Sequence, residues 1–102
     1  MSDLINKDEY MSKMADNLVL LRTKLRLKQT DLANKVGVSR QTLMGIENKK
    51  RPMTWNTFVA LLSIFREDDS TNGLLEYFKI YTPELGKFLI SPTIDNKLNR
   101  EA

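Results

Sequence analysis

Residues 22–51 concentrate side chains whose chemistry suits a polyanionic partner. This third of the chain holds two anions and nine cations: Arg22, Lys24, Arg26, Lys28, Lys35, Arg40, Lys49, Lys50 and Arg51. The whole chain of 102 residues has a net charge of only +3. The segment therefore carries about +7 and the remainder about −4, which favours a negatively charged partner for this region.

Four positions between residues 40 and 45 carry groups that can contact the base edges of double-stranded DNA. Arg40 can donate to O6 and N7 of guanine, Gln41 can pair with N6 and N7 of adenine, and the Met44 thioether can lie against a thymine methyl. Gly45 would let the backbone approach the groove wall, although drift at an exposed position explains a glycine equally well. Arg40 could instead bind a phosphate. We predict base contacts from these four residues.

A short helix over residues 29–36 would help to position these groups. Leu32, Ala33 and Val36 fall on one face at helical spacing. Gly37 follows them and can take the left-handed conformation that ends a helix without a Cβ clash. So short a connection makes two helices cross steeply, and the small Ala33 permits their close approach.

A second helix, over residues 40–48, is predicted to begin directly after this turn. Ser39 is a suitable N-cap, because its hydroxyl can accept hydrogen bonds from the next free amides. Leu43 and Ile46 face inward, which turns the base-contacting residues to the opposite side. The two helices together form a helix-turn-helix.

The run from Gln29 to Asn48, Q-T-D-L-A-x-x-V-G-V-S-R-x-x-L-x-x-I-E-N, resembles the DNA-binding domain of the Cro/repressor (XRE) type. The resemblance extends without a gap from about Asp16 to Phe65, roughly half of the chain. Six residues at family spacing make it specific: Gln29, Ala33, Gly37, Ser39, Ile46 and Glu47. It implies an all-α, four-helix, lambda-repressor-like domain with the helix-turn-helix at helices two and three.

The resemblance also implies contacts to the DNA backbone. The expected phosphate contacts are Lys28, Gln29, Thr42, Asn48, Lys49, Lys50 and Arg51. Lys28 stands where many relatives have a capping residue, so the first amides of that helix are left for Thr30, for water or for a phosphate oxygen. Lys49 stands where relatives often have a left-handed glycine, so we expect this loop to bend differently.

An ion pair between Arg22 and Glu47 is the structural brace that the resemblance implies. It would hold the first helix against the third, although two independent surface charges are the alternative. A partly buried pair of this kind acts as a brace more than as a large net source of stability.

Two further helices complete the predicted DNA-binding domain, residues 11–68. The first contains Met11, Met14, Leu18, Leu21 and Leu25 at steps of three and four. The fourth follows a Thr54 cap and buries Phe58, Leu61, Leu62 and Phe65. Trp55 is interpreted as a core or rim aromatic residue. Residues 1–10 show no such period and are interpreted as a flexible N-terminal arm without DNA contacts.

Residues 69–92 are interpreted as a C-terminal extension of one or two helices. Residues 70–73 read as a turn with Asn72 as the next cap, and Thr82-Pro83-Glu84 reads as another helix start, with a short edge strand at 88–91 as the alternative. Six apolar residues are predicted to form a dimer or partner contact: Leu74, Leu75, Phe78, Tyr81, Leu85 and Phe88. Residues 93–102 are expected to be a frayed tail.

The composition argues against catalysis. The chain lacks cysteine and histidine, and with them thiolate chemistry, the commonest metal ligand and the usual general base. We therefore expect no enzymatic activity, no cofactor and no metal. The sequence has no run of 18 apolar residues and no secretory signal, so we expect a cytoplasmic protein without a membrane span.

Together these patterns predict a sequence-specific transcriptional regulator, and more specifically a repressor, that binds a palindromic DNA operator as a homodimer. The alternative is an antitoxin-like module that binds a protein partner through residues 74–90 and represses its own operon. The surplus of apolar residues in that segment is what suggests the alternative.

Overall fold

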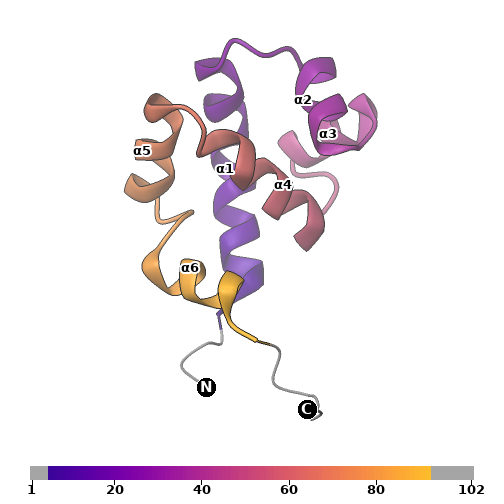
Figure 1. The fold of residues 1–102 in the computed structure, drawn as a ribbon. Coiled ribbons are helices and arrows are strands. Elements are labelled where there is room, and N and C mark those ends of the chain that lie inside the picture. Colours follow the sequence, from indigo (N-terminus) through magenta and orange to yellow (C-terminus); the bar gives the residue numbers. More distant parts are fainter. Residues whose placement is uncertain (1–4, 93–102) are drawn as a thin grey trace.

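The computed structural model describes residues 5–92, and the regular structure in that range is entirely helical (Figure 1). Its six helices are α1 (Lys7–Lys24), α2 (Gln29–Val36), α3 (Arg40–Glu47), α4 (Trp55–Phe65), α5 (Asp69–Tyr77) and α6 (Pro83–Ile90). The all-α prediction is confirmed. The alternative of an edge strand at 88–91 is wrong, because α6 continues through Ile90.

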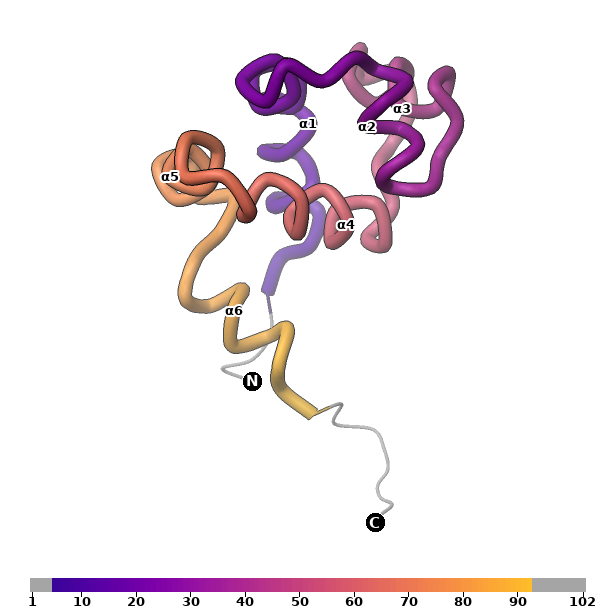
Figure 2. The backbone as a smooth tube through the Cα atoms, turned by 45° about the horizontal axis from the view of Figure 1, so that its top comes forward, coloured from indigo at the N-terminus to yellow at the C-terminus, as the bar shows by residue number. Residues whose placement is uncertain are grey.

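Helix α1 is the element around which the others are arranged. Its residues Met14, Leu18 and Leu21 are fully buried, as the predicted apolar stripe requires. The helix contacts α3, α4 and α5. In Figures 1 and 2, α2 and α3 lie toward its C-terminal end and α6 lies toward its N-terminal end. The helix-turn-helix therefore lies at the C-terminal end of α1, which is a long and well-packed helix.

Helix α1 begins earlier than the sequence pattern indicated. The side chain of Asn6 caps it by accepting from the N–H of Glu9 at 3.1 Å, and Asp8 and Glu9 place negative charge in the first turn. Tyr10 packs against the core. The prediction of a flexible arm is thus wrong for residues 7–10, which are helical; residues 1–4 lie outside the described part of the chain.

Helix α5 also begins earlier than predicted. Asp68 caps it, with its carboxylate accepting from the N–H of Ser70 at 3.0 Å. The buried hydroxyl of Thr71 donates to the carbonyl of Phe65 at 2.6 Å, which ties the new helix to the end of α4. Residues 70–73 therefore lie within α5, and the prediction of a turn with Asn72 as the cap is wrong.

Helix α6 packs near the start of α1. Thr82 caps it by accepting from the N–H of Leu85 at 3.1 Å, with Pro83 in the first turn, as predicted. The ring of Phe88 meets Trp55 edge-on at 6.1 Å, and the ammonium of Lys7 lies 5.4 Å from the Phe88 ring. These contacts join α6 to both α1 and α4.

The apolar residues of α5 and α6 complete one core together with the first four helices. Leu75, Ile80 and Leu85 have no exposed surface. The other residues predicted to contact a dimer partner or another protein pack partly against this same core: Leu74, Phe78, Tyr81 and Phe88. The segment is thus an integral part of the fold, and the prediction that Leu75 and Leu85 face a partner is wrong. The tail expected to fray, residues 93–102, lies outside the described residues.

Candidate nucleic-acid interface

The corner between α2 and α3 is built by local backbone bonds. Gly37 ends α2 in the left-handed conformation, with φ at 80°, and its N–H donates to the carbonyl of Ala33 at 2.9 Å. The N–H of Val38 donates to the same carbonyl at 3.0 Å. Ser39 Oγ then caps α3 by accepting from the N–H of Thr42 at 3.0 Å. The predicted glycine turn and serine cap are confirmed.

The inward faces of the two helices are buried in the common core. Leu32 and Ala33 of α2 and Leu43 and Ile46 of α3 are at most 2% exposed. Because these side chains fix the rotation of α3 about its own axis, its opposite side has to face solvent.

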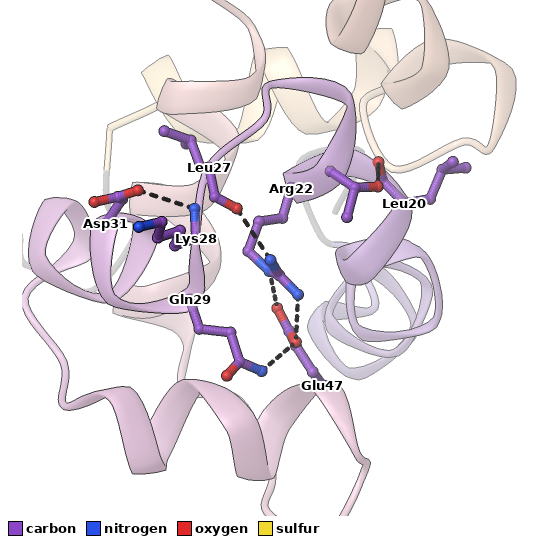
Figure 3. Close-up of polar contacts among 8 residues, drawn as sticks. Leu20, Arg22, Leu27, Lys28, Gln29, Asp31 and Glu47 are labelled. Carbon is purple, nitrogen blue, oxygen red and sulfur yellow. Dashed lines mark hydrogen bonds and ion pairs between the residues drawn. The ribbon is translucent and has the colours of Figure 1, made fainter.

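A buried carboxylate ties α3 to both α1 and α2, as Figure 3 shows. Arg22 Nε donates to Glu47 Oε2 at 2.6 Å, and Arg22 Nη2 donates to Oε1 at 3.2 Å. Gln29 Nε2 donates to the same Oε1 at 3.0 Å, and Arg22 Nη1 reaches the carbonyl of Leu27 at 3.0 Å. The ion pair implied by the resemblance is present and holds α3 against α1, and the Gln29 bond adds α2 to the same carboxylate.

The start of α2 lies beside the end of α3, because Gln29 reaches Glu47. The side chain of Lys28 gives α2 no cap, and its backbone N–H donates to Asp31 at 2.9 Å. The amino end of α2 therefore offers free amides and a lysine to an anion. Gln29 was predicted to contact a phosphate. One N–H of its side-chain amide donates to Glu47, and the second N–H remains available to a phosphate. Its part in the brace was missed, because spacing alone does not show which way a helix-start side chain turns.

The reading face of α3, defined as Arg40, Gln41, Met44 and Gly45, points away from the core. Arg40 and Gln41 are exposed, and Met44 and Gly45 are half-buried. The outward orientation predicted for this face is therefore observed. It presents a guanidinium, a carboxamide and a thioether within about one and a half turns of one helix.

The loop after α3 contradicts one expectation from the sequence. Lys49 adopts the left-handed conformation, with φ at 61°, so the lysine does not prevent this conformation at the end of α3. The ammonium of Lys49 lies 2.6 Å from Asp16 Oδ1, on α1. Because a left-handed lysine costs about 1–2 kcal/mol, this ion pair and the bond from Lys50 N–H to Gly45 O, at 2.9 Å, help to maintain it. The role of Asp16 was missed, since no local pattern links it to Lys49.

Two residues predicted to contact phosphates, Thr42 and Arg51, contact each other. Arg51 Nη1 donates to Thr42 Oγ1 at 2.6 Å. A Cβ placed on Gly45 would lie 3.2 Å from the Cβ of Arg51, so this glycine leaves room for the arginine stem. A glycine in the middle of a helix costs about 1 kcal/mol in helix propensity. At Gly45 the close approach of the Arg51 side chain explains it.

Exposed polar groups, three of them positively charged, lie at the C-terminal end of α3. Asn48, Lys50 and Arg51, in the loop, are exposed, and so is Lys28 at the start of α2.

Within residues 5–92 no group of three acidic, histidine or cysteine side chains could hold a metal ion. In the same range no helix has the length and hydrophobicity that a membrane span needs.

Comparison with known proteins identifies the family to which this arrangement belongs. A family model described as Helix-turn-helix matches residues 18–67, which include most of α1 together with α2, α3 and α4. No curated protein and no solved structure matches the chain. The chain is a member of the Cro/repressor (XRE) type helix-turn-helix family of DNA-binding transcription regulators.

Proposed function

We propose that this protein is a sequence-specific transcriptional repressor, and that it binds a palindromic operator as a homodimer in the cytoplasm. The observation that carries the proposal is the outward reading face of α3, held in place by the buried contacts of Glu47. A rigid polar face is what readout of base edges needs, because loosely held side chains would lose specificity.

The N-terminal half of α3 would enter the major groove, which is about 12 Å wide and admits one helix. Arg40, Gln41 and Met44 would then face base edges, with Gly45 close to the groove wall. The free amides of α2, together with Lys28, would meet one phosphate backbone. Asn48 and Lys50 would meet phosphates from the loop after α3. The phosphate contacts would supply most of the affinity, and the base contacts the sequence preference.

Lys49 and Gln29 would contribute less to phosphate binding than their positions in the sequence suggest. The ammonium of Lys49 is already paired with Asp16, and one amide N–H of Gln29 is bonded to Glu47. Each would have to share or exchange that bond to reach a phosphate.

Two copies related by a twofold axis would place two α3 helices in successive major grooves, about 10–10.5 base pairs apart. An operator that overlaps a promoter would then be closed to the transcription machinery by occupancy alone. This mechanism requires no ligand and no catalytic group.

The antitoxin-like alternative depended on a surplus of exposed apolar side chains in residues 74–90, and most of that surplus is absent. The apolar side chains of residues 74–90 that it invoked, above all Leu75 and Leu85, are buried within this chain. A partner could reach them only if α5 and α6 first detached from α1 and α4.

Selection from random double-stranded DNA, with sequencing of the bound pool, tests the proposed function. We expect enrichment of a palindrome made of two short half-sites about one helical turn apart. Footprinting on the selected site should show protection of both half-sites at the same protein concentration. A bound pool without an enriched motif would contradict sequence-specific regulation, and a single half-site would contradict the dimer.

A further inference from the structure

We propose that Arg51 is a specificity-determining residue that reads a guanine, and that it reaches the reading face from the loop after α3; this inference rests on the proposed function. A loop cation is expected to bind a phosphate. Here, however, the side chain turns back along the helix, and Arg51 Nη1 donates to Thr42 Oγ1 at 2.6 Å. Thr42 lies in the N-terminal half of α3, the part of such helices that meets base edges.

Gly45 provides the path for this side chain. A Cβ at Gly45 would lie 3.2 Å from the Cβ and 3.8 Å from the Cδ of Arg51, so the arginine stem covers the bare helix backbone. The N–H groups of Lys50 and Arg51 donate to the carbonyl of Gly45 at 2.9 and 3.2 Å. The aliphatic part of the Arg51 side chain and the backbone of the loop are thus both held at Gly45.

The hydroxyl that anchors the guanidinium is itself held in place. Ser39 Oγ donates to Thr42 Oγ1 at 3.0 Å, and it also accepts from the N–H of Thr42 at 3.0 Å. Within residues 5–92, Thr42 is the one hydrogen-bond partner found for the Arg51 guanidinium, and Arg51 is exposed. Four of its five N–H donors are therefore available to an acceptor on another molecule.

The path of this side chain favours a base over a phosphate. At about 100° per residue, Gly45 lies roughly 40° from Gln41 around the helix, so the arginine stem borders the face that carries Gln41, and the guanidinium lies at the edge of that face beside Thr42, about 100° from Gln41. A planar guanidinium fork matches O6 and N7 of guanine, and this pairing is the commonest specific contact in the major groove. A phosphate contact needs only a positive charge within reach. A side chain already held along the helix also loses less rotational freedom when it binds.

The test compares four full-length proteins in selection from random double-stranded DNA: wild type, Arg51→Lys, Thr42→Val and Lys50→Gln. For the wild type we expect a guanine at one fixed position of each half-site. Arg51→Lys keeps the charge but loses the fork, so preference for that guanine should fall roughly 10-fold or more while the rest of the motif persists. Thr42→Val should lower the same preference less, because the Ser39 cap on the Thr42 amide remains. Lys50→Gln, the matched control, should weaken binding to all sequences alike.

The possible outcomes separate this inference from the function on which it rests. If Arg51→Lys selects the wild-type motif unchanged, Arg51 acts on phosphates and the inference is overturned. If the wild type itself selects no motif, the proposed function fails, and the inference fails with it. Thermal unfolding followed by circular dichroism should confirm that every variant remains folded under the selection conditions.

Discussion

At the scale of single residues, Glu47 has the largest structural role in the helix-turn-helix. It is 9% exposed, and its two oxygens accept three hydrogen bonds from Arg22 and Gln29. Burial of a carboxylate is costly unless its oxygens are paired, so the value of the arrangement lies mainly in fixing geometry. Loss of one partner therefore costs more than the pair contributes as a whole.

We expect Arg22→Met to lower the free energy of unfolding by about 3 kcal/mol, because it leaves the buried charge of Glu47 without its cation. The double variant Arg22→Met/Glu47→Leu removes both charges and should recover a large part of that loss. Urea denaturation of the two variants and the wild type measures the difference. A double variant less stable than Arg22→Met would show that the pair contributes directly to stability.

Gln41 is the residue whose proposed role is most easily separated from stability, because its side chain is exposed. Gln41→Ala should lower affinity for the selected operator by about 1–3 kcal/mol and change binding to random DNA little. Fluorescence anisotropy with both DNAs at one salt concentration measures this. Equal losses on both DNAs would place Gln41 outside the base-reading surface.

At the scale of elements, turns and caps determine where each helix begins and ends. Gly37 and Gly73 show how the conformation of a glycine at a helix end differs from that of a glycine inside a helix. Apart from chain neighbours and the backbone of the same helix, neither has an atom within 4 Å of the position that a Cβ would occupy, but Gly37 has φ at +80° and Gly73 lies inside α5. Substitution at these sites therefore tests backbone conformation without a steric clash.

Gly37→Ala should destabilise the protein by about 1–2 kcal/mol, because an L-residue is strained in the left-handed conformation. Gly73→Ala should stabilise it by about 0.5–1 kcal/mol, because alanine is the better helix former. Thermal and urea unfolding of both variants provide the comparison. A Gly37→Ala variant as stable as the wild type would mean that the corner of the helix-turn-helix does not depend on the left-handed glycine.

The cap of α5 adds a pH dependence. Hydrogen bonds from the Ser70 hydroxyl and then from the Ser70 amide hold the pKa of Asp68 below its ordinary value of 3.8. A carboxyl group whose pKa is depressed in the folded state stabilises the fold above its unfolded pKa, and the contribution is lost as pH falls through the folded pKa.

We therefore expect Asp68→Asn to be less stable than wild type at neutral pH, with the difference narrowing as the pH falls below 3.8. Urea unfolding at several pH values measures this, since asparagine can still cap the helix but carries no charge. A difference in unfolding free energy that does not change with pH would contradict the role of the ionised cap.

At the scale of the whole molecule, α5 and α6 complete the core of the DNA-binding domain. Leu85 has no exposed surface, whereas Ile90, on the same helix, is 85% exposed. The ring contacts of α6 with Trp55 extend this packing to the start of α4. Stability of α6 and stability of the helix-turn-helix should consequently be coupled.

Leu85→Ala should lower the free energy of unfolding by about 2–5 kcal/mol through the cavity it leaves, in a single cooperative transition. Ile90→Ala, the matched control, should change it by no more than about 0.5 kcal/mol. Urea unfolding should be followed both by circular dichroism and by Trp55 fluorescence. Two separate transitions for Leu85→Ala would indicate that residues 69–92 form an independent unit.

Local signals in the sequence were sufficient to place several helix ends, both in the helix-turn-helix and beyond it. Gly37, Ser39, Thr54 and Thr82 act within three or four residues of the bonds they make, so sequence spacing alone identifies their roles. The Arg22–Glu47 pair was accessible only through resemblance to a family, because it joins helices that are distant in the chain.

The tertiary structure alone decided which surfaces are free. Apolar periodicity indicates that a side chain must be covered but not what covers it, so Leu75 and Leu85 could be assigned to this chain's core only once α5 and α6 were placed. The pairing of Lys49 with Asp16 and the path of Arg51 over Gly45 to Thr42 likewise depend on how separate segments meet in space. Spacing along one helix contains no information about such contacts, because they are set by the packing of the whole core.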